Sequence, residues 1–173
     1  MIRFFDIFFS FIAFTVFFPI FVIVSVFLRM TGEGEIIFLQ KRIGLGGQEF
    51  RIIKFRTMLK NSSNMGTGNI TVKNDPRILP FGKFLRSSKI NELPQLINIL
   101  KGEMSIIGPR PLTKDQFDKY PMNIQEELKE IRPGLSGIGS IIFRNEEEIL
   151  ELEQNLKMHE DILSYKATLE SWY

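Results

Sequence analysis

The stretch from Ile7 to Leu28 contains no charged residue, and more than half of the chain's 17 phenylalanines lie within the first 28 residues. As a straight helix, such a stretch would cross about 30 Å, the thickness of the hydrocarbon core of a bilayer. Few soluble helices are apolar on every side over this length. We therefore expect the segment to insert into a membrane.

Pro19 lies near the centre of this stretch and should bend the helix, because proline removes a backbone hydrogen bond and clashes with the preceding turn. The bend allows a kinked span or a re-entrant helix that leaves on the side it entered. Arg3 and Arg29 flank the segment and favour cytoplasmic placement of both ends, hence re-entry. A signal peptide is the alternative, but no small-residue cleavage site precedes Arg29. A buried core helix is a second alternative.

The rest of the chain has the composition of a globular domain, since 44% of the 173 residues are apolar and 24% are charged. The absence of cysteine excludes disulfides, thiolate metal sites and a cysteine nucleophile. The formal charge of +2 hides a basic segment from Lys41 to Lys60, with six basic residues and one acid. Such a segment beside an apolar helix suits anionic headgroups or phosphorylated substrates.

The pattern after residue 30 predicts a helix-dominated α+β domain, residues 31–173, attached to a kinked re-entrant membrane helix, residues 1–30. Short apolar runs separated by glycines predict a β-hairpin, and punctuation by proline and glycine predicts short helices. A segment rich in Ser, Asn, Gly and Thr predicts a surface loop able to order over a substrate. The expected elements are strands Ile36–Leu39 and Phe50–Phe55, the turn Gly44–Gly47, the loop Asn61–Asn74, helices Phe81–Arg86, Gln116–Ile131 and Glu146–Ser171, a helix with Pro94 near its first turn that Gly102 stops, the turn Pro133–Gly137, and the strand Ile138–Phe143.

Glu92 and Arg110 are the residues best suited to chemistry. We place Glu92 in the first turn of the helix stopped by Gly102, where the helix dipole stabilises an ionised carboxylate. It is a candidate base, nucleophile or magnesium ligand, although such carboxylates often have no chemical role. Arg110 lies between Pro109 and Pro111, which fix the backbone and prepare the guanidinium for phosphate. An exposed arginine in a structural turn is the alternative.

A basic cluster surrounds the predicted hairpin. Lys54 and Arg56 lie two residues apart in a strand and therefore point to one face. With Lys41 and Arg42 they could hold a diphosphate or lie against lipid headgroups, and a solvated basic face explains them equally well.

Several other chemistries are disfavoured. The basic residues lack an aromatic stacking pattern and the chain carries a membrane segment, so we expect no nucleic-acid partner. The glycines from Gly44 to Gly47 do not follow a strand and open a helix, as a dinucleotide site requires. His159 is the single histidine and lies among acids on a polar helix, so we expect a surface residue.

Ordered blocks along nearly the whole chain carry a family resemblance. They are Arg3-Phe4-Phe5-Asp6, Gln40–Gly44, Phe50–Met58, Asp75-Pro76-Arg77, Gly82–Arg86, Glu92–Leu96, Asn98, Lys101-Gly102, Met104-Ser105, Gly108–Pro111 and Pro133-Gly134. In these blocks the chain resembles the small monotopic phosphoglycosyl transferases, or bacterial sugar transferases, that start glycoconjugate assembly.

The resemblance implies an enzyme that transfers a sugar phosphate from a UDP-sugar to polyprenyl (undecaprenyl) phosphate and releases UMP. It implies Mg²⁺ as cofactor, a re-entrant helix and a catalytic domain on the cytoplasmic face of the bacterial inner membrane. The implied partners are UDP-sugar, polyprenyl phosphate, membrane lipids and downstream glycosyltransferases.

The resemblance also implies residue roles. Glu92 matches the glutamate of an Asp-Glu dyad that assists proton transfer or binds the metal, and Pro19 matches the helix-breaking proline. Arg110 matches the arginine of the Pro-Arg-Pro turn. Candidate phosphate contacts are Lys54, Arg56 and Arg86.

Two positions depart from the family pattern. Phe18 stands where the family has serine, so only the proline half of the helix break is present. Asn91 occupies the position of the dyad's nucleophilic aspartate, and a neutral amide is a poor nucleophile. Either Glu92 is the nucleophile or supports direct transfer, or the chain is inactive by loss of function, or Asn91 was introduced to stop turnover. The second functional hypothesis is a catalytically silent, membrane-bound relative that binds nucleotide sugar or partner transferases.

Overall fold

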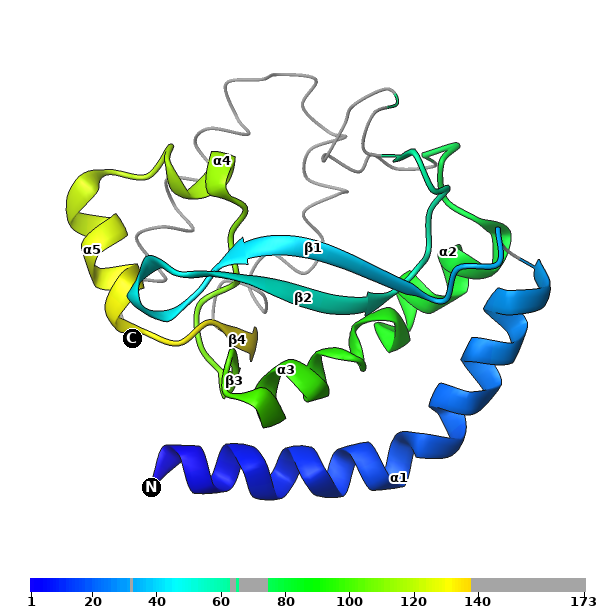
Figure 1. The fold of residues 1–173 in the computed structure, drawn as a ribbon, viewed down its shortest axis with the longest axis horizontal. Helices are drawn as coiled ribbons and strands as arrows, with labels where there is room; N and C mark the ends of the chain where they lie inside the picture. Colours follow the sequence, from blue (N-terminus) through cyan, green and yellow to red (C-terminus); the bar gives the residue numbers. More distant parts are fainter. Residues whose placement is uncertain (32, 63–64, 66–74, 138–173) are drawn as a thin grey trace.

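The computed structural model describes residues 1–31, 33–62, 65 and 75–137, and Figure 1 shows an α+β arrangement of helices and two small sheets beside an N-terminal apolar helix. The elements in chain order are α1 (Ile2–Thr31), β1 (Ile37–Ile43), the 3-10 turn η1 (Leu45–Gly47), β2 (Glu49–Phe55), α2 (Pro80–Ser87), the 3-10 turn η3 (Ile90–Glu92), α3 (Gln95–Lys101), β3 (Ser105–Ile107), α4 (Lys114–Phe117), α5 (Met122–Glu130) and β4 (Gly134–Ser136).

The predicted hairpin is confirmed, and its first strand is longer than expected. β1 and β2 pair antiparallel, with Ile37 opposite Phe55 and Ile43 opposite Glu49. Gly46 and Gly47 have φ angles of +70° and +72°, which glycine adopts without the steric cost of a Cβ. Because β1 extends to Ile43, Lys41 and Arg42 of the basic cluster lie within the strand.

α3 is fixed to the free edge of β2 by one buried side chain. The Asn98 Oδ1 atom accepts a hydrogen bond from the Ile53 N–H (3.0 Å), and its Nδ2 donates to the Arg51 carbonyl (2.8 Å). An amide side chain that both donates and accepts in this way substitutes for a neighbouring strand. The predicted helix end is also confirmed, since Gly102 follows Lys101 with a φ of +92°.

A second, parallel sheet was not predicted. β3 pairs with β4, with Ser105 opposite Gly134, so the segment expected to be only a turn is partly a strand. Two glycines allow this close approach, because a Cβ on Gly134 would lie 2.1 Å from the Gly108 nitrogen and one on Gly108 would lie 2.5 Å from the Arg132 carbonyl oxygen. The prediction missed the strand because its partner lies about thirty residues away in sequence.

The single helix predicted over Gln116–Ile131 is wrong. The structure has two helices, α4 and α5, with Pro121 as the N-cap of the second. Proline restricts the residue before it to extended conformations, which ends the first helix. Thr113 and Gln116 form a capping box at the start of α4.

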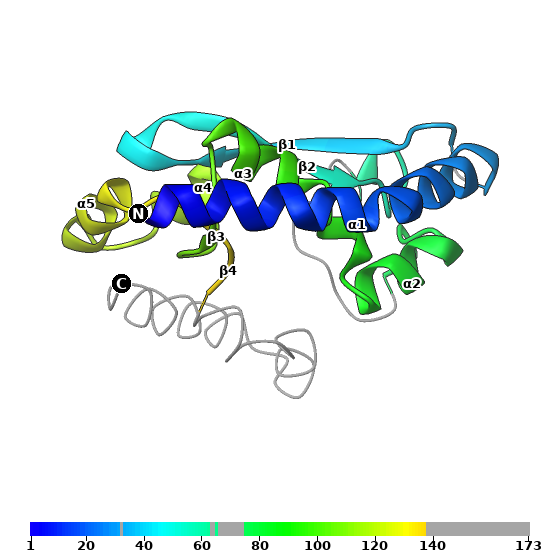
Figure 2. The ribbon, with the colours of Figure 1, turned by 90° about the horizontal axis from the view of Figure 1, so that it is seen from below.

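α1 contains Pro19, and its axis changes direction between its two ends (Figure 1). It crosses in front of α3 when seen from below (Figure 2). A stripe of inward residues at helical spacing packs on the domain, and other faces expose large apolar side chains. The inward stripe includes Asp6, Ser10, Phe14, Phe21, Val24 and Leu28, and exposed residues include Phe4, Phe8, Phe11, Val16, Phe18, Ile23 and Val26.

The N-terminal end of α1 is attached to the domain by polar contacts. The buried Asp6 carboxylate accepts hydrogen bonds from the Ser105 hydroxyl (2.7 Å) and the Ile106 N–H (3.0 Å). The Arg3 guanidinium donates to the Leu100 carbonyl near the end of α3 (3.0 Å). These bonds connect α1 to both α3 and β3.

Some sequence predictions lie outside the described residues. They are the strand Ile138–Phe143, the helix Glu146–Ser171, the placement of His159 and most of the loop Asn61–Asn74.

We expect Asp6→Ala to destabilise the protein by about 1–3 kcal/mol, because it leaves the buried Ser105 hydroxyl and Ile106 N–H without an acceptor. The unfolding free energy of the lipid-reconstituted protein measures this loss. Glu127→Ala removes an exposed carboxylate from α5 and is the control. Equal losses in the two variants would contradict a specific role for the Asp6 contacts.

Candidate active site

An ion pair between Lys54 and Glu92 forms the centre of the candidate site. The Lys54 Nζ atom lies 2.8 Å from the Glu92 Oε1 atom, and the side chains are 18% and 28% exposed. Lys54 comes from β2 and Glu92 from η3, two elements that meet where α3 packs on the edge of the hairpin. Partial burial strengthens the attraction and leaves both groups open to a ligand.

The backbone before Glu92 turns sharply. Lys89 has a φ of +60°, which is uncommon for a residue with a Cβ, and it redirects the chain from α2 into η3. The Glu92 N–H then donates to the Lys89 carbonyl (3.0 Å). The prediction that Glu92 lies in the first turn of the following helix is therefore wrong by a few residues, since α3 begins only at Gln95.

The ionisation of Glu92 follows from nearby cations. Burial raises the pKa of the Glu92 carboxyl, but the charges of Lys54, Arg110 and Lys89 and the hydrogen bond from Lys54 outweigh this and hold the pKa below its usual value. Glu92 is therefore ionised at neutral pH. The sequence attributed this effect to a helix dipole, and the structure attributes it to side-chain charges.

The pKa of Lys54 is also lowered, and for an ammonium group this disfavours the charged form. Burial, with the repulsion of Arg110 and Arg42, lowers the pKa of the Lys54 ammonium despite the attraction of Glu92. Among the residues that the structure describes, cations therefore outnumber carboxylates around this pair, an arrangement that favours binding of an anion.

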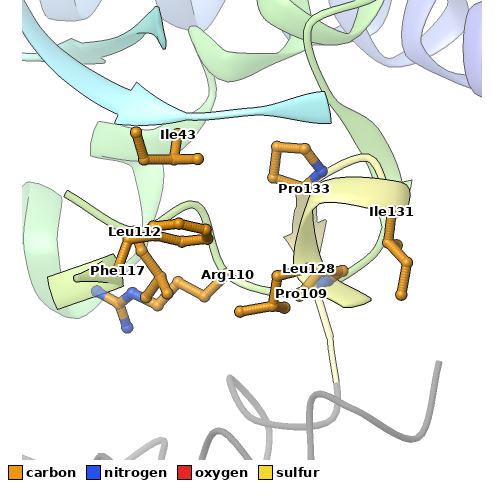
Figure 3. A pocket seen from close by; sticks show the side chains of 8 residues that line it. All are labelled: Ile43, Pro109, Arg110, Leu112, Phe117, Leu128, Ile131 and Pro133. Carbon is orange, nitrogen blue, oxygen red and sulfur yellow. The ribbon is translucent and has the colours of Figure 1, made fainter. Parts of the chain in front are cut away.

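The Arg110 turn is fixed from two sides. The Gly134 N–H donates to the Pro109 carbonyl (2.8 Å), and the Ile43 N–H donates to the Leu112 carbonyl (2.9 Å). Arg110 itself is exposed, and Figure 3 shows its side chain extending toward Leu112 and Phe117 and away from Pro133. It lies on a small pocket lined otherwise by Ile43, Pro109, Leu112, Phe117, Leu128, Ile131 and Pro133.

Asn91 is a buried neighbour of Glu92. Its side chain is 7% exposed, and within the described part of the chain its buried Oδ1 atom meets no hydrogen-bond donor. A buried, unpaired amide oxygen is costly, and such groups concentrate at functional sites. The structure thus buries Asn91 directly before Glu92 in η3.

The remaining predicted phosphate contacts have other surroundings. Arg56 lies just beyond β2, and its guanidinium pairs with Glu35 (2.5 Å) and lies over the Phe38 ring (5.6 Å from its centre). The charge of Arg56 is thus paired with a carboxylate, as that of Lys54 is. Arg86 is half-buried in the last turn of α2, which leads into Lys89 and η3.

The described residues hold no group of three or more His, Cys, Asp or Glu side chains able to bind a metal ion. Two residues that are consecutive in η3 carry oxygen donors, the carboxylate of Glu92 and the unpaired Oδ1 atom of Asn91. This set fits Mg²⁺, because magnesium is usually bound through one or two protein oxygens together with substrate phosphates and water.

Sequence reasoning missed Lys89 as a contributor to the site, and it named Arg42 only as one member of the basic cluster. Arg42 and Lys89 both act on the electrostatics of the site, Arg42 through Lys54 and Lys89 through Glu92. A signal was present for Arg42, because it belongs to the Gln40–Gly44 block.

The chain belongs to the bacterial sugar transferase family, whose model matches residues 1–172. It is 39% identical over 141 residues to a UDP-N-acetylgalactosamine-undecaprenyl-phosphate N-acetylgalactosaminephosphotransferase of Aeromonas hydrophila, covering 79% of this chain and 33% of that protein. It is 33% identical over 158 residues to the exopolysaccharide production protein ExoY of Rhizobium meliloti, covering 83% and 70% of the two chains.

A third relative is the UDP-glucose:undecaprenyl-phosphate glucose-1-phosphate transferase of Xanthomonas campestris pv. campestris, with 40% identity over 121 residues. The match covers 69% of this chain and 25% of the relative. The chain thus spans about a third or less of the length of two of these relatives and most of the length of ExoY.

We expect Lys54→Met to raise the pKa of the Glu92 carboxyl, because it removes the cation that pairs with that group and leaves the effect of burial less opposed. Carbon NMR titration of Glu92 measures the change. Lys41→Met breaks the exposed Lys41–Glu49 pair (2.9 Å) on the same hairpin and should leave the titration of Glu92 unaltered. An unchanged pKa in Lys54→Met would show that Lys54 does not control the ionisation of Glu92.

Proposed function

We propose that this chain transfers a sugar phosphate from a UDP-sugar to polyprenyl (undecaprenyl) phosphate, releases UMP, and so starts assembly of a bacterial polysaccharide or other glycoconjugate. The observation that carries the proposal is the Lys54–Glu92 pair, with Arg110 near enough to lower the pKa of Glu92, on a domain packed against an exposed apolar helix. The activities for which the relatives from Aeromonas and Xanthomonas are named support it.

Fixed cations supply what phosphoryl transfer most requires of a protein. The diphosphate of the donor and the phosphate of the acceptor are both anionic, and negative charge develops on the leaving oxygen during transfer. Lys54 and Arg110 are held by the backbone before any ligand binds, so they can neutralise this charge with little reorganisation.

The reaction breaks the bond between the sugar-bearing phosphorus and the bridging oxygen, which leaves on UMP. In one route a Glu92 oxygen attacks that phosphorus, and an oxygen of polyprenyl phosphate then displaces Glu92. In the other, the polyprenyl phosphate oxygen attacks directly while Glu92 orients the reactants. The Asn91 amide has no charged oxygen for attack, so neither route uses it as nucleophile.

Mg²⁺ belongs to the proposal as the cofactor. When bound, it supplies positive charge to the phosphate oxygens. Glu92 and the Asn91 Oδ1 atom would hold it together with the donor diphosphate.

α1 is proposed to lie in the cytoplasmic membrane as a re-entrant helix, with residues 31–173 as the catalytic domain on the cytoplasmic face. Among the described residues, α1 is the one helix that is long enough and apolar enough to cross a membrane. Its apolar residues are largely exposed rather than buried in the domain. Pro19 supports a bend within the bilayer. Placement at a leaflet would bring the water-soluble donor and the lipid acceptor to one site.

A catalytically silent relative is the second candidate function. Asn91 favours it, because this residue stands where the family pattern has the nucleophilic aspartate. In this case the site would bind nucleotide sugar or partner transferases without turnover.

We expect the lipid-reconstituted chain to release UMP from at least one UDP-sugar when polyprenyl phosphate and Mg²⁺ are present, and Asn91→Asp to release it faster by about 10-fold or more because it restores a carboxylate nucleophile. A panel of UDP-sugars with UMP detection measures both. Turnover confined to Asn91→Asp would support the silent relative and contradict the active enzyme. Removal of Mg²⁺ with EDTA should abolish release, and addition of excess Mg²⁺ should restore it.

Incubation with UDP-sugar alone distinguishes the two routes. If transfer is direct, intact-mass measurement should show no added sugar phosphate on the unaltered chain, whereas Asn91→Asp should gain one. Glu92→Gln is the control, because it removes the carboxylate of Glu92, the alternative nucleophile. A sugar phosphate mapped to Glu92 in the unaltered chain would instead identify Glu92 as the nucleophile.

A further inference from the structure

Arg42 has an unusual set of contacts in β1. Its Nη1 atom donates to the Pro111 carbonyl (2.9 Å) and approaches the Gln116 Oε1 atom (3.4 Å), and its Nη2 donates to the Gln40 Oε1 atom (2.6 Å). Within the described part of the chain, all of these acceptors are uncharged. The guanidinium therefore connects β1, the Arg110 turn and the start of α4 without a carboxylate hydrogen-bonded to it.

The hydrogen bond from Arg42 to the Pro111 carbonyl is the third hydrogen bond that holds the Arg110 turn. The carbonyl groups of Pro109 and Leu112 accept from backbone N–H groups of β4 and β1, and the carbonyl of Pro111 accepts from Arg42. Arg42 is thus the one side chain among these three donors, and it holds the residue that directly follows Arg110.

Arg42 holds this turn against an electrostatic cost. Burial and the charge of Arg110 lower the pKa of Arg42 to about 10, and Glu92 opposes them. A half-buried cation close to another cation is unfavourable unless a negative charge compensates it. Stability alone would not favour a charged donor here, whereas an anionic ligand would provide the compensation.

We propose that Arg42 is a positioning residue that holds the Pro109–Pro111 turn so that Arg110 faces the Glu92 centre, where a nucleoside diphosphate binds. This inference rests on the proposed function, because it names the donor's diphosphate as the ligand. Arg42 acts on the ligand through Arg110 and not by direct contact. Its Nη1 and Nη2 atoms already bond to protein oxygens, and its Nε atom is buried.

A double-mutant cycle tests the path through Arg110. We expect Arg42→Gln to lower kcat/KM for UMP release by on the order of 10- to 100-fold, as misplacement of a catalytic group does. Arg42→Gln combined with Arg110→Gln should be no worse than Arg110→Gln alone, because residues that act as a unit are not additive. Losses that multiply would overturn the proposal.

Arg51→Gln is the matched control. It removes the same charge from an exposed position on β2, opposite Lys41 and one pair along the hairpin from Arg42. We expect kcat/KM to change by less than about twofold, as for most exposed charges. A loss equal to that of Arg42→Gln would show that net charge of the hairpin matters and would overturn the positioning role.

Thermal stabilisation by UDP gives a readout that does not need turnover. UDP should raise the Tm of the unaltered chain, and the rise should be much smaller in Arg42→Gln, whose Tm without UDP should not fall. A purely structural role would lower the Tm without UDP and leave the rise intact, which would contradict the proposal. If Arg42→Gln fails to fold, Arg42→Lys provides the same test, because an ammonium keeps the charge but lacks the planar fork.

The two measurements separate this inference from the proposed function. A normal UDP response without UMP release from any UDP-sugar would overturn the transferase activity, and the comparison of Arg42→Gln with Arg51→Gln would still decide the role of Arg42. UMP release that is unchanged in Arg42→Gln would overturn the Arg42 inference and leave the activity standing.

Discussion

In the described part of the chain, the Lys54–Glu92 ion pair lies where cations outnumber carboxylates, and this imbalance governs the interpretation of the site. The pKa values of Lys54 and Arg42 are both lowered, mainly by burial and in part by neighbouring positive charge. Half-buried charges of this kind contribute little net stability. Uncharged contacts therefore hold the site together, among them the Asn98 bridge to β2 and the close approach of Gly108 to Gly134. The fold thus supports an excess of positive charge, which a phosphorylated ligand would relieve.

Features encoded in contiguous sequence were predictable. The hairpin, α2 and the end of α3 at Gly102 follow from apolar spacing and from glycine and proline positions, which act over a few residues. Glu92 and Arg110 could be proposed as candidates, because a carboxylate close to a helix start and an arginine between prolines are visible in sequence. The pairing of Glu92 with Lys54 was not predictable, since these residues are 38 positions apart and meet only through tertiary packing.

The errors share a physical origin in non-local contacts. β4 forms because Gly134 fits against Gly108, a steric match that no local propensity encodes. Arg56 was predicted as a phosphate contact without its partner Glu35, which lies 21 residues earlier in the sequence. Arg42 was recognised only as one member of a basic cluster. Its role in the turn depends on the Pro111 carbonyl, which tertiary structure brings to β1.

The apolar helix and the charged site share one hydrophobic core. Ala13 and Phe14 of α1 pack against a cluster formed by Ile52 of β2 and Leu96 of α3, the elements that carry Lys54 and follow Glu92. Closely packed interiors transmit displacement instead of absorbing it. If α1 lies in a leaflet as proposed, its depth therefore fixes the height of Glu92 above the lipid. The polar contacts of Asp6 and Arg3 add to this at the other end of α3, so the helix sets the position of the site as well as anchoring it.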